Sequence, residues 1–161
     1  MKLSVLLDTS FFVRLLNDED NLHSNAKGYF RYFLDKEITL KVSTISIAEY
    51  CVGGKLDELP LRNIQIFPFN LDHAQRTGEF AEAIFEENKI SIEKLSPRAI
   101  IPNDSKLFAQ ADLDNTITHF ITSDSRSKST FSALKKRFNP KFQIIDISIP
   151  YNETFGILDL Q

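Results

Sequence analysis

The feature of the sequence that most restricts its fold is a repeated change of hydrophobic period. Residues 3–7 form an almost continuous apolar run, typical of a strand buried on both faces, and residues 11–16 then carry apolar side chains at helical spacing. Residues 22–33 repeat the helical period, and residues 38–42 alternate apolar and polar side chains as a strand does. Short strands that alternate with amphipathic helices predict an α/β fold.

The same alternation continues along the rest of the chain. We expect helices over 45–52, 71–87, 104–114 and 129–138, and strands at 64–66, 119–122 and 142–147. Residues 88–103 contain two prolines and a mixed pattern, so we expect no regular structure there. Right-handed crossovers between such strands imply a mainly parallel sheet with helices on both faces, which is a three-layer α/β/α sandwich.

Length and composition favour one globular domain over residues 1–161. The formal net charge of -3 gives no reason to expect general adhesion to nucleic acids or membranes, so any nucleic acid must be met locally. Asp8 interrupts the first apolar run too early for a secretory signal, and no apolar run approaches membrane-spanning length. We therefore expect a cytoplasmic protein.

Four acidic residues are expected to meet at one edge of this sheet. Asp8 and Asp124 each follow a strand, and the carboxyl ends of parallel strands share an edge. Asp104 opens a crossover helix, which must begin at that same edge. Glu49 lies in the helix after the second strand, close enough to its start for a long side chain to reach back. The functional crevice of such folds lies at this edge.

Several carboxylates in one crevice raise one another's pKa unless a cation accompanies them. Leu107, Phe108 and Ala111 mark the face of Asp104 as the apolar one, so its carboxylate should point inward. Oxygen-only ligands favour Mg²⁺ or Mn²⁺. Zinc is disfavoured because the single Cys51 and the scattered histidines show no zinc-ligand spacing.

Each acid also has a simpler interpretation. Asp8, Asp104 and Asp124 all stand where helices begin, and any one of them taken alone is better read as a helix N-cap. Glu49 taken alone is equally well read as a solvated side chain. The joint pattern of four acids favours a shared site.

The motifs that carry these acids resemble the PIN-domain family. The matching stretches are Val5-Leu6-Leu7-Asp8-Thr9-Ser10, Ile47-Ala48-Glu49, Asp104 with Ala109 and Ala111, and Ile121-Thr122-Ser123-Asp124, in the order that the family has them. The resemblance spans nearly the whole chain.

This resemblance implies a three-layer fold and a Mg²⁺- or Mn²⁺-dependent endoribonuclease. It implies that Asp8, Glu49, Asp104 and Asp124 are the catalytic, metal-binding acids, and that Ser10 and Thr122 are hydroxyls that orient a carboxylate or water. Many bacterial members are toxins of type II toxin–antitoxin pairs. Such toxins commonly form homodimers and are silenced by a small antitoxin.

Three competing interpretations can be compared with this one. A non-catalytic PIN-like module that binds RNA or protein is the main alternative, and the presence of all four acids argues against it. A phosphoacceptor receiver domain needs an Asp pair at the first strand and a Lys after the last, whereas Asp8 is unpaired and Lys141 precedes the last strand. A dinucleotide-binding or P-loop domain needs a glycine-rich loop, which does not follow Leu7.

Two surface features bear on partners. Positive charge gathers in the C-terminal third, where a rim that faces RNA phosphates and an ordinary solvated helix face are equally good interpretations. The residues of this segment are Arg126, Lys128, Lys135, Lys136 and Arg137. Tyr29, Tyr32 and Phe33 are best read as core, because apolar residues at helical spacing usually are, but they cover more of a helix than one buried stripe needs, so a dimer or antitoxin surface is the alternative.

Overall fold

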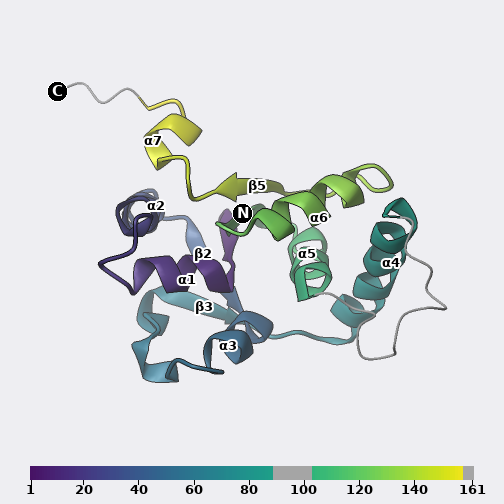
Figure 1. Ribbon diagram of the computed structural model, residues 1–161, viewed down its shortest axis with the longest axis horizontal. Coiled ribbons are helices and arrows are strands. Elements are labelled where there is room, and N and C mark those ends of the chain that lie inside the picture. Colours follow the sequence, from purple (N-terminus) through teal and green to yellow (C-terminus); the bar gives the residue numbers. More distant parts are fainter. Residues whose placement is uncertain (89–102, 158–161) are drawn as a thin grey trace.

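A computed structural model describes residues 1–88 and 103–157 of the chain (Figure 1). Five strands form one sheet in the order β3-β2-β1-β4-β5, and every neighbouring pair is parallel. The strands are β1 (Ser4–Leu7), β2 (Thr39–Ser43), β3 (Ile64–Phe67), β4 (Ile117–Thr122) and β5 (Gln143–Asp146). The chain leaves β1 toward β2 on one side and returns to β4 on the other, so the strand order reverses between β1 and β4.

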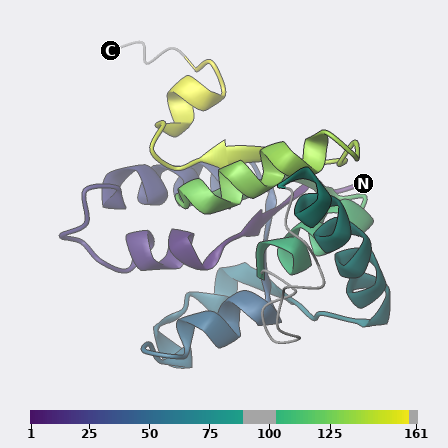
Figure 2. The same ribbon diagram turned by 45° about the vertical axis from the view of Figure 1, so that its right-hand side comes forward.

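Helices cover both faces of this sheet. In both views α1 and α2 lie on one side of the strands and α4 and α5 on the other (Figure 1, Figure 2). The helices are α1 (Thr9–Leu15), α2 (His23–Asp35), α3 (Thr44–Tyr50), α4 (Leu71–Glu87), α5 (Asn103–Leu113), α6 (Ser125–Lys135) and α7 (Tyr151–Thr154), with short 3-10 turns at Leu56–Glu58 and Leu61–Asn63. The expected three-layer α/β/α fold is confirmed.

The alternation of side chains in the strands divides the core between the two faces. Val5 and Leu7 of β1 belong to the cluster under α1 and α2, whereas Leu6 points to the opposite face, under α4, α5 and α6. This second cluster is rich in aromatic rings, and Phe108 contacts Phe120 at its centre. Burial on both faces explains why the sequence of β1 is an almost unbroken apolar run.

Two helix boundaries differ from those expected from the sequence. The helix expected over 45–52 ends at Tyr50, and Val52 is 89% exposed, so Val52 does not extend its packed face. The Tyr50 ring turns back over Gly54, and its hydroxyl donates to Glu58 at 2.7 Å, which folds the chain into a turn. The helix expected over 129–138 instead begins at Ser125, because Asp124 caps it.

The aromatic surface of α2 is covered by the chain's own C-terminal part. Tyr29 and Phe33 are buried, and Tyr32 stacks on Phe155 with ring centroids 4.6 Å apart. The Tyr29 hydroxyl also donates to the Ile149 carbonyl at 2.6 Å. These rings therefore hold α7 in place, which agrees with the core interpretation and not with the alternative of a free partner surface.

Two further expectations concern residues 88–103 and membrane-spanning helices. The prediction of no regular structure over 88–103 falls almost wholly outside them. None of the helices in the described ranges has the length and apolar character needed to cross a bilayer.

Candidate active site

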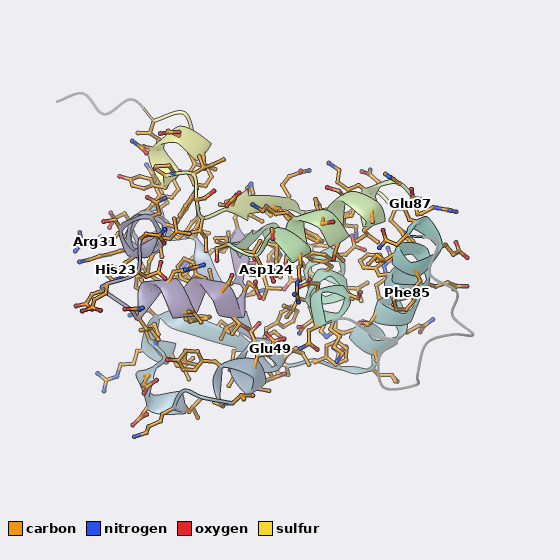
Figure 3. All side chains as sticks on the ribbon, in the orientation of Figure 1. His23, Arg31, Glu49, Phe85, Glu87 and Asp124 are labelled. Carbon is orange, nitrogen blue, oxygen red and sulfur yellow. The ribbon has the colours of Figure 1, made fainter. Side chains whose placement is uncertain are left out.

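A pocket of about 380 Å³ opens at the carboxyl ends of β1 and β4, where the strand order reverses. Figure 3 places Glu49 and Asp124 near the middle of the molecule, between α3 and the start of α6, and places Glu87 at the far end of α4. All four acids expected from the sequence line this pocket. Its lining residues are Asp8, Thr9, Ser10, Glu49, Asn103, Asp104, Asp124, Arg126 and Thr130.

Asp8 is the most buried acid of the pocket, with 6% of its surface exposed. It is the N-cap of α1, and its Oδ1 accepts the Thr9 backbone N–H at 2.8 Å. Its Oδ2 accepts the Ser10 hydroxyl at 3.0 Å and the Thr122 hydroxyl at 2.7 Å. One carboxylate therefore caps α1 and also lines the pocket.

Burial raises the pKa of Asp8 from its ordinary value of 3.8 to about 6. The hydroxyls of Thr122 and Ser10 and the Thr9 N–H oppose this shift, because they bind the ionised form. The nearby negative charge of Asp104 adds to it. The donors around Asp8 thus offset only part of the cost of burying its ionised form.

Asp104 stands in the first turn of α5 and is the electrostatic centre of the pocket. Burial raises its pKa, and the Ser127 hydroxyl, which donates to Asp104 Oδ1 at 2.8 Å, opposes the shift. The charges of Asp124 and Glu49 raise the Asp104 pKa further. These mutual effects mean that the four acids share one electrostatic environment.

Glu49 reaches the pocket from α3, and it is half-buried rather than solvated. Two side chains from other helices donate to its carboxylate: the Thr9 hydroxyl to Oε2 and the Asn103 amide to Oε1. The alternative of a freely solvated Glu49 is therefore wrong for this structure.

Asp124 is the N-cap of α6, and its Oδ1 accepts the Arg126 backbone N–H at 2.8 Å. Its own N–H donates to the Thr122 hydroxyl at 3.0 Å, which also donates to Asp8. Thr122 therefore connects the end of β1 to the end of β4.

The donors of the pocket have the chemistry that a hard cation prefers, because they are carboxylate and hydroxyl oxygens. As the side chains lie, however, the described ranges contain no group of three or more Asp, Glu, His or Cys residues arranged to hold one metal ion together. The pocket thus has suitable donors without a fully assembled ligand cage.

The basic residues expected to face RNA do not act as one group. Arg126 lines the pocket, and within the described ranges no ion pair engages it. Lys128 instead pairs with Asp146 at 2.6 Å, and Lys135 lies over the Phe131 ring. The remaining two, Lys136 and Arg137, pair with Glu86 and Glu87 at the end of α4. Of these five residues, Arg126 is the one that lines the pocket, whereas the other four have partners elsewhere on the surface.

Three polar residues that bind the acids were not expected from the sequence, and two of them, Thr9 and Asn103, line the pocket. Thr9, Asn103 and Ser127 each donate to one of the acids. Thr9 and Asn103 directly adjoin Asp8 and Asp104 in sequence, and Ser127 lies three residues after Asp124, one helical turn away. Proximity to an acid was thus the available signal, although it does not tell which acid each donor binds.

The solved structures that resemble this chain include two that carry the name VapBC. VapBC2 from Rickettsia felis, solved bound to a DNA fragment from its promoter, is 19% identical with a TM-score of 0.58, over 89% of this chain and 98% of that chain. DNA-bound VapBC from Salmonella typhimurium is 15% identical with a TM-score of 0.55, over 90% and 98%. No protein-family model and no curated protein sequence matched the chain. At these identities the likeness is one of fold alone, and it agrees with the three-layer, PIN-like fold expected from the motifs.

Proposed function

We propose that this chain is a Mg²⁺- or Mn²⁺-dependent endoribonuclease whose acids are Asp8, Glu49, Asp104 and Asp124. The observation that carries the proposal is the convergence of these four acids, from four separate parts of the chain, on one pocket at the reversal of strand order. Burying carboxylates without a positive partner costs free energy of folding. Such clusters are therefore typical of sites where the carboxylates bind a ligand or take part in a reaction.

A divalent cation is the partner that this pocket fits. Mg²⁺ keeps several waters and commonly needs only one or two protein carboxylates, so a complete cage is not required. Asp8 and Asp104 are the strongest candidates to hold it, because burial raises the pKa of both and a cation would relieve that cost. Such an ion makes water a better nucleophile and stabilises the charge that develops on a phosphodiester during hydrolysis.

Arg126 is the residue we assign to the substrate's phosphate. It is the single cationic side chain among the described residues that line the pocket, and its charge lowers the pKa of Asp104, which places it in the same field. A guanidinium can bind a phosphate group through two parallel N–H donors. Arg126 would thus counter the repulsion between RNA and the acids.

We also propose that the protein is the toxin of a toxin–antitoxin pair and forms a homodimer. This proposal rests on the resemblance of the motifs to the PIN-domain family and on the fold shared with two VapBC structures. A light-scattering mass would test the dimer. Co-purification of a small protein encoded beside this one, which also relieves growth arrest, would support the pair.

The nuclease is tested by incubating the purified protein with mixed RNAs in Mn²⁺ or in EDTA, beside Asp8→Asn and Asp104→Asn. We expect cleavage by the wild type in Mn²⁺ only, and none by either variant, with folding intact. Asp146→Asn is the matched control, because Asp146 also ends a strand at this sheet edge but does not line the pocket.

Cleavage that survives chelation would exclude the metal mechanism. Full activity of either pocket variant would overturn the site. RNA binding without cleavage in any metal would favour the non-catalytic PIN-like module.

A further inference from the structure

Glu49 is the acid of the pocket with the weakest support from its own helix. It occupies the last turn of α3, a helix of seven residues, and the neighbouring Ala48 is exposed. A long, flexible side chain at such a position has many accessible rotamers. Something outside α3 must therefore keep its carboxylate in the pocket.

Two neutral donors from other helices supply this restraint. The Thr9 hydroxyl of α1 donates to Oε2 of Glu49, and the Asn103 amide of α5 donates to Oε1. The two donors lie 40 and 54 residues from Glu49 along the chain, so the contact joins three helices. Within residues 1–88 and 103–157 no further hydrogen bond engages either carboxylate oxygen, so each has a lone pair for another partner.

The orientation of each donor is itself fixed. The Thr9 hydroxyl has one proton, and its other acceptor, the Ser46 carbonyl, lies at a long 3.4 Å, so the proton goes to Glu49. The Lys106 ammonium donates to Asn103 Oδ1 at 3.1 Å, which turns the amide nitrogen toward Glu49. Lys106 thereby acts on Glu49 through Asn103.

We propose that Thr9 and Asn103 are positioning residues that hold the Glu49 carboxylate ready for the cation. The inference rests on the proposed function for its consequence, and on the two hydrogen bonds for its geometry. Because both donors are neutral, they orient the carboxylate and leave its charge for the metal. Loss of either one frees Glu49 to turn toward solvent.

The first test does not require a metal. In EDTA, the side-chain NH₂ protons of Asn103 are followed by NMR in the wild type and in Glu49→Ala. We expect one of these protons to be shifted downfield in the wild type, as in a hydrogen bond to a carboxylate, and to return to an ordinary position in the variant. Identical Asn103 signals in the two proteins would overturn the proposal whether or not the protein is a nuclease.

The second test compares Thr9→Val, which keeps the shape and loses the hydroxyl, with Thr9→Ser, which keeps the hydroxyl. We expect Thr9→Val to weaken Mn²⁺ binding by about 10- to 100-fold, as is usual for partners of metal ligands, with an unchanged melting temperature. Thr9→Ser should restore the wild-type affinity. Asn103→Ala should weaken binding in the same range.

The outcomes separate the two proposals. If the wild type binds Mn²⁺ and Thr9→Val binds it equally well, the positioning role is wrong while the nuclease proposal stands. Tighter binding by Asn103→Ala would also overturn that role, because it would mean that Asn103 competes with the ion. If the wild type binds no Mn²⁺, the proposed function fails, and the NMR comparison alone decides whether the two donors hold Glu49.

Discussion

The raised pKa of Asp8 predicts that this acid makes the folded protein less stable as the pH rises. Its pKa is about 6 in the folded state against an ordinary value of 3.8, so between these values the folded state binds more protons than the unfolded state. Unfolding then releases a proton, and the free energy of unfolding decreases with increasing pH through this window. Above it, the ionised and desolvated carboxylate is a constant cost.

The size of the effect follows from the same two values. At about pH 5 the raised pKa of Asp8 contributes about 1.4 kcal/mol to the free energy of unfolding, and at about pH 7.5 it contributes almost nothing. The Asp8→Asn variant lacks this titration and keeps an oxygen able to accept the Thr9 N–H. Its unfolding free energy relative to the wild type should therefore rise by about 1.4 kcal/mol between the two pH values.

Urea denaturation at both pH values, in EDTA, measures this difference directly. Any hydrogen bonds that asparagine fails to make affect both measurements equally, so they cancel in the comparison. The reasoning would be refuted if the difference in unfolding free energy between variant and wild type were the same at both pH values, or if it fell as the pH rose. EDTA is essential because a bound cation would favour the ionised carboxylate.

Asp146→Asn provides the matched control for this measurement. Burial alone would raise the Asp146 pKa, but the Lys128 ammonium and the Ser148 N–H outweigh it and hold the pKa below 3.8. A lowered carboxyl pKa stabilises the protein above the unfolded value, and that stability is lost only as the pH falls through the folded value. The difference in unfolding free energy between Asp146→Asn and the wild type should thus stay constant between about pH 5 and about pH 7.5.

Three further perturbations test other parts of the structure. Arg126→Ala should weaken RNA binding across sequences, and it should reduce the slope of log affinity against log salt concentration by about 1. Arg137→Ala should leave RNA binding unchanged. Both variants are measured by titrating RNA binding at several salt concentrations. Phe108→Ala should lower the free energy of unfolding by about 3–5 kcal/mol in urea, because Phe108 is fully buried among other rings. Tyr29→Phe should cost about 1–2 kcal/mol in the same assay, because the Ile149 carbonyl loses its donor.

The positions of Asp8 and Asp124 could be predicted because each directly follows a strand. Parallel strands bring their carboxyl ends to one edge, and no knowledge of side-chain contacts is needed to place such residues. Asp104 followed from the same topology, since a crossover helix must start where the strands end. These three placements depend on the chain path alone.

The packing of Glu49 could not be obtained in this way. Its helix was expected to run on to Val52, yet the chain turns after Tyr50, whose ring lies over Gly54. Helical periodicity does not report such a turn, and it does not reveal that Thr9 from a distant segment binds Glu49. Contacts of this kind are decided by tertiary structure and have no local signature.

The role of the basic residues 126–137 could not be predicted from the sequence either. Their sequence allowed an RNA-facing rim or a structural helix face, and the choice depended on where the acidic partners of Arg137 lie. Those partners, Glu86 and Glu87, are on α4, about 50 residues earlier in the chain. The sequence could not reveal these long-range ion pairs, nor that Arg126 is the basic residue of the segment that lies beside the acids.

The pocket holds three of its acids through neutral side-chain donors, and this arrangement has a physical consequence. A lysine or arginine partner would stabilise each carboxylate by cancelling its charge, whereas a hydroxyl or amide favours the ionised form and leaves the charge in place. Asp8 shows the balance, because two hydroxyls and a backbone N–H lower its pKa and burial still raises it to about 6. The pocket therefore lacks compensating positive charge, and under the proposed function a divalent ion would supply it. The neutral donors are Thr9, Ser10, Asn103, Thr122 and Ser127.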